Sequence, residues 1–196
     1  MELDFQAIIN EFGCEPSHGG VLRAPIKVVA NLPYYITSPI INILLQNPYV
    51  SEMTLMVQKE VAERIVASPG GRDYGILTLA CNYFADTEMI MIVSKDCFFP
   101  KPKVDSAVVH FIKHPIEVST ASSRTDEFHD PNYDQLFKLI KASFAQRRKK
   151  LLNSLTNAGY NKDTIANALI KLGFDENVRA ENLSLDDYKK LLGFFS

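Results

Sequence analysis

The chain has 196 residues, of which 46% are apolar and 22% are charged, and this composition is typical of a folded globular protein. A formal net charge of −2 argues against a generic polycationic nucleic-acid binder but still allows a local basic patch. Three widely spaced cysteines, Cys14, Cys81 and Cys97, indicate a reducing compartment with neither disulfides nor structural zinc. No secretory signal or spanning apolar run is found, so we expect a soluble cytoplasmic protein.

The first half alternates predicted strands and helices. Residues 27–30 form a short apolar run typical of a buried strand. The next helix is predicted to begin with Thr37 or Ser38 as its N-cap and Pro39 in its first position, and to end before residues 47–48. Further elements follow: a strand over 53–58, a helix over 59–67, residues 74–85 (helix preferred over strand), and strands over 88–94 and 106–113.

This order predicts a doubly wound α/β sheet, with the last two strands forming an antiparallel hairpin at its edge. Residues 117–133 are polar and acidic, and only helical patterns follow them. We therefore divide the chain into an α/β part (1–115), a polar linker (116–131) and a small all-α domain (132–196).

The most informative motif is Asn31-Leu32-Pro33-Tyr34, which directly follows the first buried strand. Ligands of open α/β sheets bind at the carboxyl ends of strands. There, the Asn31 side chain and the Leu32 carbonyl group could accept both protons of an exocyclic amine, while Tyr34 could stack on the base. Such an arrangement suits N-methylation of a base. For these four residues alone, a proline turn with a packed tyrosine is an equally good interpretation.

Residues 28–40 (VVANLPYYITSPI) resemble motif IV of the KsgA family of ribosomal RNA adenine-N6,N6 dimethyltransferases. Four later blocks resemble the same family in the same order: 58–65 (QKEVAERI), 98–109 (FFPKPKVDSAVV), 143–155 (SFAQRRKKLLNSL) and 179–191 (RAENLSLDDYKKL). The agreement of all five blocks is far more specific than any one of them.

This resemblance implies methyl transfer from S-adenosylmethionine to two adjacent adenosines of small-subunit rRNA during ribosome maturation. By the same resemblance, Asn31 would contact cofactor and target amine, and Leu32 and Pro33 would line the pocket, Pro33 also on the cofactor side. Tyr34 and Phe98 would enclose the flipped adenine. Without the family, Phe98 is more simply a core residue. No metal is implied.

Basic residues without any acidic neighbour run through residues 135–162: Lys138, Lys141, Arg147, Arg148, Lys149, Lys150 and Lys162. We expect the cluster Arg147–Arg148–Lys149–Lys150 to contact RNA phosphates, although a solvated helix face is the usual meaning of such a run. Lys101 and Lys103 could hold the phosphates around the flipped base. The expected partner is small-subunit rRNA in a 30S precursor, bound by an enzyme that is monomeric at full length.

The sequence departs from the family in its cofactor site. A Gly-rich turn after the first strand and an acidic residue after the second are not found, and residues 3–12 resemble the segment just before the family's fourth strand. We therefore expect an incomplete Rossmann-like methyltransferase sheet, made of the later strands only and followed by the all-α domain. Such a chain should bind S-adenosylmethionine poorly and be inactive alone.

Three alternatives stay open. The chain could be a non-catalytic RNA- or ribosome-binding assembly module. A DNA N6-adenine methyltransferase shares a similar pocket motif, and an Erm-like enzyme that modifies a single rRNA site shares the motif itself; the carboxyl-terminal blocks disfavour both.

Overall fold

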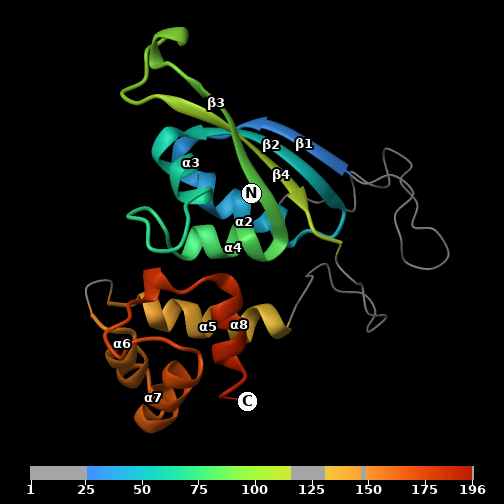
Figure 1. Ribbon diagram of the computed structural model, residues 1–196. Helices are drawn as coiled ribbons and strands as arrows, with labels where there is room; N and C mark the ends of the chain where they lie inside the picture. The colour runs from blue at the N-terminus through green and yellow to red at the C-terminus, as the bar shows by residue number, and fades with distance from the viewer. Residues whose placement is uncertain (1–25, 116–130, 147–148, 196) are drawn as a thin grey trace, which may run out of the picture.

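The computed structural model describes residues 26–115, 131–146 and 149–195. It places a four-stranded sheet above a layer of helices, with the carboxyl-terminal helices beneath that layer (Figure 1). The regular elements are β1 (Ile26–Asn31), α2 (Thr37–Gln46), β2 (Val50–Gln58), α3 (Lys59–Ile65), α4 (Ile76–Phe84), β3 (Ala85–Val93), β4 (Ser106–Lys113), α5 (Pro131–Phe144), α6 (Leu151–Asn157), α7 (Lys162–Lys171) and α8 (Leu185–Leu192), with short 3₁₀ turns at Tyr34–Ile36, Lys95–Cys97 and Ala180–Asn182. This mixed α/β body followed by helices agrees with the predicted fold class.

The strands lie in the order β1-β2-β4-β3. β1 and β2 are parallel, whereas β4 runs antiparallel to both of its neighbours. The predicted hairpin of β3 and β4 is confirmed, with β3 as the outer strand. In this register Asn31 lies opposite Met56, and Gln58 lies opposite Ser106. The carboxyl ends of β1 and β2 therefore meet the beginning of β4 at one edge of the sheet.

Alternating residues of the central strands form the core. Met53, Leu55 and Val57 of β2 and Val109 and Phe111 of β4 are fully buried on the side of the sheet that faces α2, α3 and α4. This alternation is what a strand half-covered by helices requires, since successive side chains point to opposite faces.

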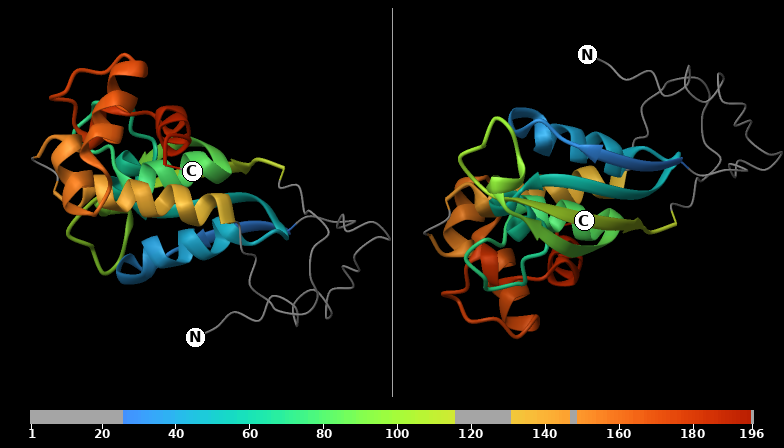
Figure 2. Two further views of the ribbon diagram at one scale, coloured as in Figure 1. Left: turned by 90° about the horizontal axis from the view of Figure 1, so that it is seen from below. Right: turned by 90° about the horizontal axis from the view of Figure 1, so that it is seen from above.

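The prediction of helices on both faces of the sheet is wrong for the part of the chain that the structure describes. The helices there lie on one side of the sheet, as the two views of Figure 2 show. On the opposite face Val29 of β1 is 83% exposed and Ile112 of β4 is 57% exposed. In the described residues, the helices therefore all lie on one side of the sheet.

The start of α2 differs from the prediction for a local reason. Thr37 is the first helical residue, so neither Thr37 nor Ser38 is the N-cap and Pro39 occupies the third position. The Thr37 hydroxyl donates to the Pro33 carbonyl group at 3.0 Å, which draws the chain directly from the 3₁₀ turn into the helix. The end of the helix at Gln46 and the helical assignment of residues 74–85 are both confirmed.

The carboxyl-terminal helices pack against α4 and α2 through buried side chains. Tyr133 of α5 stacks on Phe137 and lies with its ring 4.8 Å from that of Phe84, and its hydroxyl donates to Asn42 Oδ1 at 3.2 Å. The hydroxyl of the buried Tyr74 donates to the Leu183 carbonyl group at 2.9 Å. The helices from α5 onward thus share a continuous core with the sheet and with α2, α3 and α4.

No helix built from the described residues is both long enough and apolar enough to cross a membrane.

Candidate functional site

A hollow of about 340 Å³ lies at the edge of the sheet where β1 ends and β4 begins. Two segments that are distant in sequence line it, together with the first residue of β4: Asn31, Leu32, Pro33, Tyr34, Phe98, Phe99, Pro100, Pro102 and Ser106. The structure therefore brings together all five residues that the sequence placed at the reaction site, because β4 returns the loop of residues 94–105 to the end of β1. We call this hollow the Asn31 pocket.

The first wall of the Asn31 pocket carries hydrogen-bond acceptors. The backbone N–H of the buried Leu32 donates to the Met56 carbonyl group at 3.1 Å, which continues the pairing of β1 with β2. The Pro33 carbonyl group accepts from Thr37. In the described part of the chain, no residue donates to the Leu32 carbonyl oxygen or to the exposed Asn31 side chain. Two acceptors next to each other in the chain thus lack a donor among the described residues.

Tyr34 and Phe98 line the Asn31 pocket from different segments of the chain. Tyr34 is 38% exposed, and its hydroxyl lies 3.1 Å from Ser106 Oγ. Phe98 is half-buried, and its backbone N–H donates to the Lys95 carbonyl group. The Tyr34 ring is held through its hydroxyl, and both residues line the pocket, which suits stacking on a planar group.

Asp105 fixes the ends of the loop that carries Phe98. Its carboxylate accepts from the Lys95 backbone N–H at 3.0 Å, and its backbone carbonyl group accepts from the N–H of Lys59 at 3.0 Å. Sequence reasoning missed Asp105 and Ser106. The sequence feature that could have identified them is their position between a loop with two prolines and a strand of strong β propensity.

Lys101 and Lys103 lie on the same loop and are exposed, but neither lines the Asn31 pocket. Lys101 forms an ion pair with Asp96. Lys103 forms no ion pair with any residue that the structure describes, so its charge is available to an anion near the pocket.

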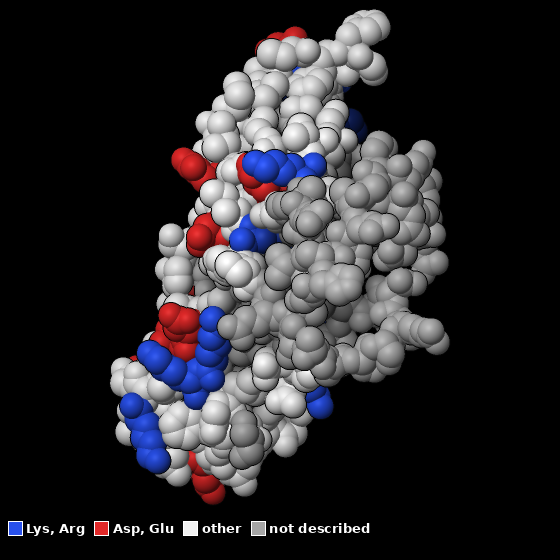
Figure 3. Space-filling view, turned by 90° about the vertical axis from the view of Figure 1, so that its right-hand side faces the viewer, with Lys and Arg blue, Asp and Glu red and all other residues white. Residues whose placement is uncertain are grey.

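The predicted phosphate-contacting cluster is described only in part. Arg147 and Arg148 lie outside the described residues, whereas Lys149 and Lys150 are exposed just before α6. The other basic residues of this run, Lys138, Lys141 and Lys162, are exposed as well. On the side of the molecule in Figure 3, lysine and arginine side chains gather over the lower, helical part with acidic side chains beside them, so that side is not of one sign.

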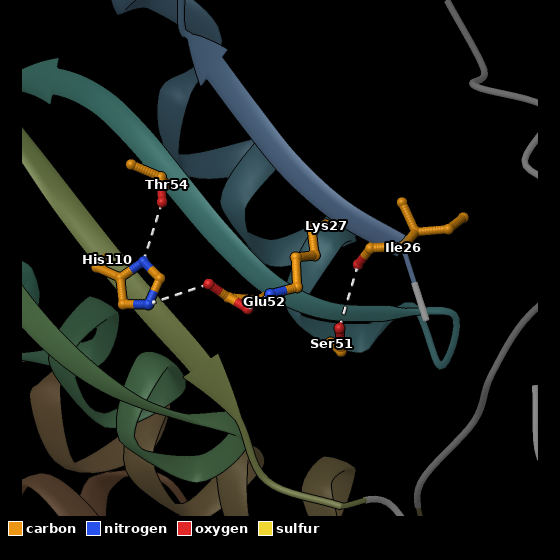
Figure 4. Close-up of polar contacts among 6 residues, drawn as sticks. All are labelled: Ile26, Lys27, Ser51, Glu52, Thr54 and His110. Carbon is orange, nitrogen blue, oxygen red and sulfur yellow. Dashed lines mark hydrogen bonds and ion pairs between the residues drawn. The ribbon is translucent and has the colours of Figure 1, made fainter. Parts of the chain in front are cut away.

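A polar network that sequence reasoning did not foresee crosses the opposite face of the sheet (Figure 4). The Thr54 hydroxyl lies 2.9 Å from His110 Nδ1, and His110 Nε2 lies 3.4 Å from Glu52 Oε1. Lys27 Nζ lies 2.5 Å from Glu52 Oε2, and this hydrogen bond lowers the pKa of Glu52 below its usual value. The network ties together β1, β2 and β4. In the residues that the structure describes, no histidine, cysteine and carboxylate side chains group as metal ligands.

Comparisons with known proteins agree with the resemblance. The profile of a family described as "Ribosomal RNA adenine dimethylase" matches residues 21–196. The chain is 41% identical to proteins named "Ribosomal RNA small subunit methyltransferase A" from Lachnoclostridium phytofermentans and from Clostridioides difficile, with 97% of the chain and 61% of each relative covered. A protein of the same name from Chlamydia trachomatis is 45% identical, with 84% of the chain and 57% of the relative covered. The chain thus spans about three fifths of the length of these relatives.

Two solved structures resemble the fold. A dimethyladenosine transferase from Plasmodium falciparum superposes with a TM-score of 0.65 at 27% identity, covering 95% of this chain and 74% of that one. The 23S rRNA methyltransferase ErmE superposes with a TM-score of 0.60 at 22% identity, covering 88% of this chain and 66% of that one, and supports the fold alone.

Proposed function

This chain belongs to the ribosomal RNA adenine dimethylase family, and we propose that it forms the adenosine-binding part of an rRNA adenine-N6,N6 dimethyltransferase. The observation that carries the proposal is the Asn31 pocket. There, two acceptors without a donor among the described residues lie beside the rings of Tyr34 and Phe98.

The proposed role of these groups follows from their chemistry. An adenine N6 amine has two N–H donors, which Asn31 Oδ1 and the Leu32 carbonyl group would accept. Both hydrogen bonds draw the nitrogen lone pair out of conjugation with the ring and direct it toward an electrophile. Tyr34 and Phe98 would stack on the base after it leaves the RNA helix, and Pro33 would shape the turn between them.

S-adenosylmethionine would supply the methyl group. The described residues fit only one side of such a cofactor, because β1 leads into Asn31 and Pro33 and β2 leads into Gln58 and Lys59, with no Gly-rich turn at either strand end. Asn31 and Pro33 are the residues we assign to that side. We further propose that the 196 residues alone bind the cofactor weakly and do not transfer methyl groups.

The proposed partner is small-subunit rRNA within a 30S precursor. Lys101 and Lys103 would hold phosphates beside the pocket, and the cluster of residues 147–150 would hold phosphates of a neighbouring helix. Residues 132–196 would serve as the rRNA-recognition domain, following an α/β domain over 1–115 and a linker over 116–131. We expect the full-length enzyme to act as a cytoplasmic monomer.

The second candidate is a non-catalytic RNA-binding assembly module. The same exposed lysines favour it, and so does the absence of a Gly-rich turn at the described strand ends.

Calorimetric titration of S-adenosylmethionine into the purified chain tests the cofactor proposal, with circular dichroism as the check on folding. We expect a folded spectrum and no saturable heat. Saturable binding with a micromolar dissociation constant would overturn the proposal that the 196 residues alone bind S-adenosylmethionine weakly.

A methyl-transfer assay on small-subunit rRNA, with a full-length protein that contains this sequence, distinguishes the dimethyltransferase from the RNA-binding assembly module. Dimethylation of adjacent adenosines is the expected result. RNA binding without any transfer would favour the assembly module.

A further inference from the structure

The ring of Phe99 is fully exposed, at 102% of its reference accessible surface, although it lies on the rim of the Asn31 pocket. Its neighbour Phe98 is half-buried with an extended backbone, φ −117° and ψ 147°. In extended chain, successive side chains point to opposite sides. The half-buried Phe98 and the exposed Phe99 therefore point in opposite directions, and the Phe99 ring lies in solvent beside the pocket opening.

The loop presents this ring from a restrained backbone. Pro100 and Pro102 fix two of the φ angles that follow Phe99, and Asp105 holds the loop ends through hydrogen bonds to Lys95 and Lys59. A ligand that stacks on Phe99 would therefore order little additional chain. Lys103 adds a positive charge on the same loop, without a partner among the described residues.

We propose that Phe99 stacks on the base next to the adenosine held in the Asn31 pocket, so that the pocket rim binds two consecutive nucleotides of single-stranded RNA. This inference rests on the proposed function. When a base flips out of a strand, its neighbour loses a stacking surface, and an aromatic ring beside the pocket replaces it. Tyr34 and Phe98 then act on the target base, and Phe99 is a positioning residue for its neighbour.

The chain contains no tryptophan, so the variant Phe99→Trp carries a single fluorophore at this place. Titration with a short single-stranded RNA that contains adenosine and its flanking bases should quench this fluorophore, because an indole that stacks on a base loses emission. Ile170→Trp is the matched control, since Ile170 is 72% exposed but lies on α7. Equal quenching in both variants would overturn the proposal.

A thermodynamic cycle separates this inference from the proposed function. Phe99→Ala is compared with the wild type on an intact RNA and on RNAs that are abasic at the position before or after the target adenosine. We expect Phe99→Ala to weaken binding of the intact RNA roughly tenfold, and to have no effect on the RNA that lacks the stacked neighbour. Unchanged melting is expected, since an exposed ring contributes no packing.

An equal effect of Phe99→Ala on all RNAs, or no effect on any, would overturn the inference. An RNA that is abasic at the target position tests adenosine binding in the Asn31 pocket. If this RNA binds as tightly as the intact RNA and Phe99→Ala still weakens its binding, the proposed adenosine binding is overturned, but the stacking of Phe99 on a base is not. Failure of the chain to bind any of these RNAs would overturn both.

Discussion

The hydroxyl of Tyr34 lies 3.1 Å from Oγ of Ser106, although the two residues are 72 positions apart in the chain. Tyr34 follows β1, and Ser106 is the first residue of β4. Since β2 lies between these strands, the hydrogen bond spans the edge of the sheet and closes one side of the Asn31 pocket. The orientation of the Tyr34 ring thus depends on the pairing register of β4, and the sequence around Tyr34 does not specify that register.

The role of the hydrogen bond between Tyr34 and Ser106 can be tested with variants that remove the Tyr34 hydroxyl alone or the whole ring. Tyr34→Phe keeps the stacking surface and loses one partly buried hydrogen bond, which should lower the free energy of unfolding by about 0.5–1.5 kcal/mol and leave most of the RNA affinity in place. Tyr34→Ala also loses the stack and should lower the RNA affinity roughly ten- to a hundredfold. Ser106→Ala should reproduce Tyr34→Phe. Titration of an adenosine-containing RNA measures all three, and equal affinities for Tyr34→Phe and Tyr34→Ala would contradict a stacking role.

Asn31 is expected to act on the reaction rather than on RNA binding. In a full-length protein that contains this sequence, Asn31→Ala removes one of the two acceptors for the amine, and methyl transfer should fall at least about a hundredfold, as for other losses of one preorganised hydrogen bond at a reacting group. RNA affinity should change little, because phosphate contacts supply most of it. Single-turnover methylation and RNA titration on the same variant measure the two effects. Unchanged turnover would remove Asn31 from the reaction site.

How far the sequence predicts this site depends on the range of the interactions. The predicted strand over residues 106–113 has the observed bounds, because its apolar and β-branched pattern is local. The motif at Asn31 and the loop at Phe98 are recognisable through the resemblance, and the structure joins them. Ser106 and Asp105 escape sequence reasoning because their partners, Tyr34 and Lys95, become neighbours only after β4 has paired with β2.

Tertiary interactions also explain the differences in the fold. The first residue of α2 is set by a hydrogen bond from Thr37 to Pro33 rather than by capping propensity. The network of Thr54, His110 and Glu52 depends on cross-strand register, which single-residue patterns do not contain. The ion pairs of Lys59 with Glu63 and of Arg64 with Glu60 are predictable, because residues four apart on a helix are always neighbours.

The exposed lysines before α6 allow a test of the RNA surface within the described residues. Changing both Lys149 and Lys150 to Glu should weaken RNA binding and lower the slope of log affinity against log salt by about one for each phosphate that is no longer neutralised. Lys190→Glu is the control, because Lys190 is also exposed but belongs to α8, whereas Lys149 and Lys150 precede α6. Binding isotherms at several salt concentrations give both quantities. If the slope is the same in all variants, the lysines form only a solvated surface.

Lys113 at the end of β4 is expected to make stability depend on pH. It is buried, and its Nζ donates to the Asn47 carbonyl group at 2.6 Å and to that of Leu44 at 3.4 Å, at the end of α2. Burial lowers the pKa of Lys113 from 10.5 to about 8. Below pH 8 both the folded and the unfolded chain carry the charge, and the folded state bears the full cost of burying it. Between pH 8 and 10.5 the unfolded chain binds more protons, so the free energy of unfolding should rise with pH, by about 3 kcal/mol in total.

The variant Lys113→Met isolates this effect, because methionine fills a similar volume without a titrating group. Urea unfolding of both proteins between pH 7.5 and 10.5 should show the wild type gaining stability relative to Lys113→Met as the pH rises. Contributions from all other side chains are common to both proteins and cancel in the difference. Lys162→Met, at an exposed position, should show no such trend. A constant difference between wild type and Lys113→Met would mean that the Lys113 ammonium keeps its usual pKa, and that its two carbonyl partners at the end of α2 compensate for the loss of water.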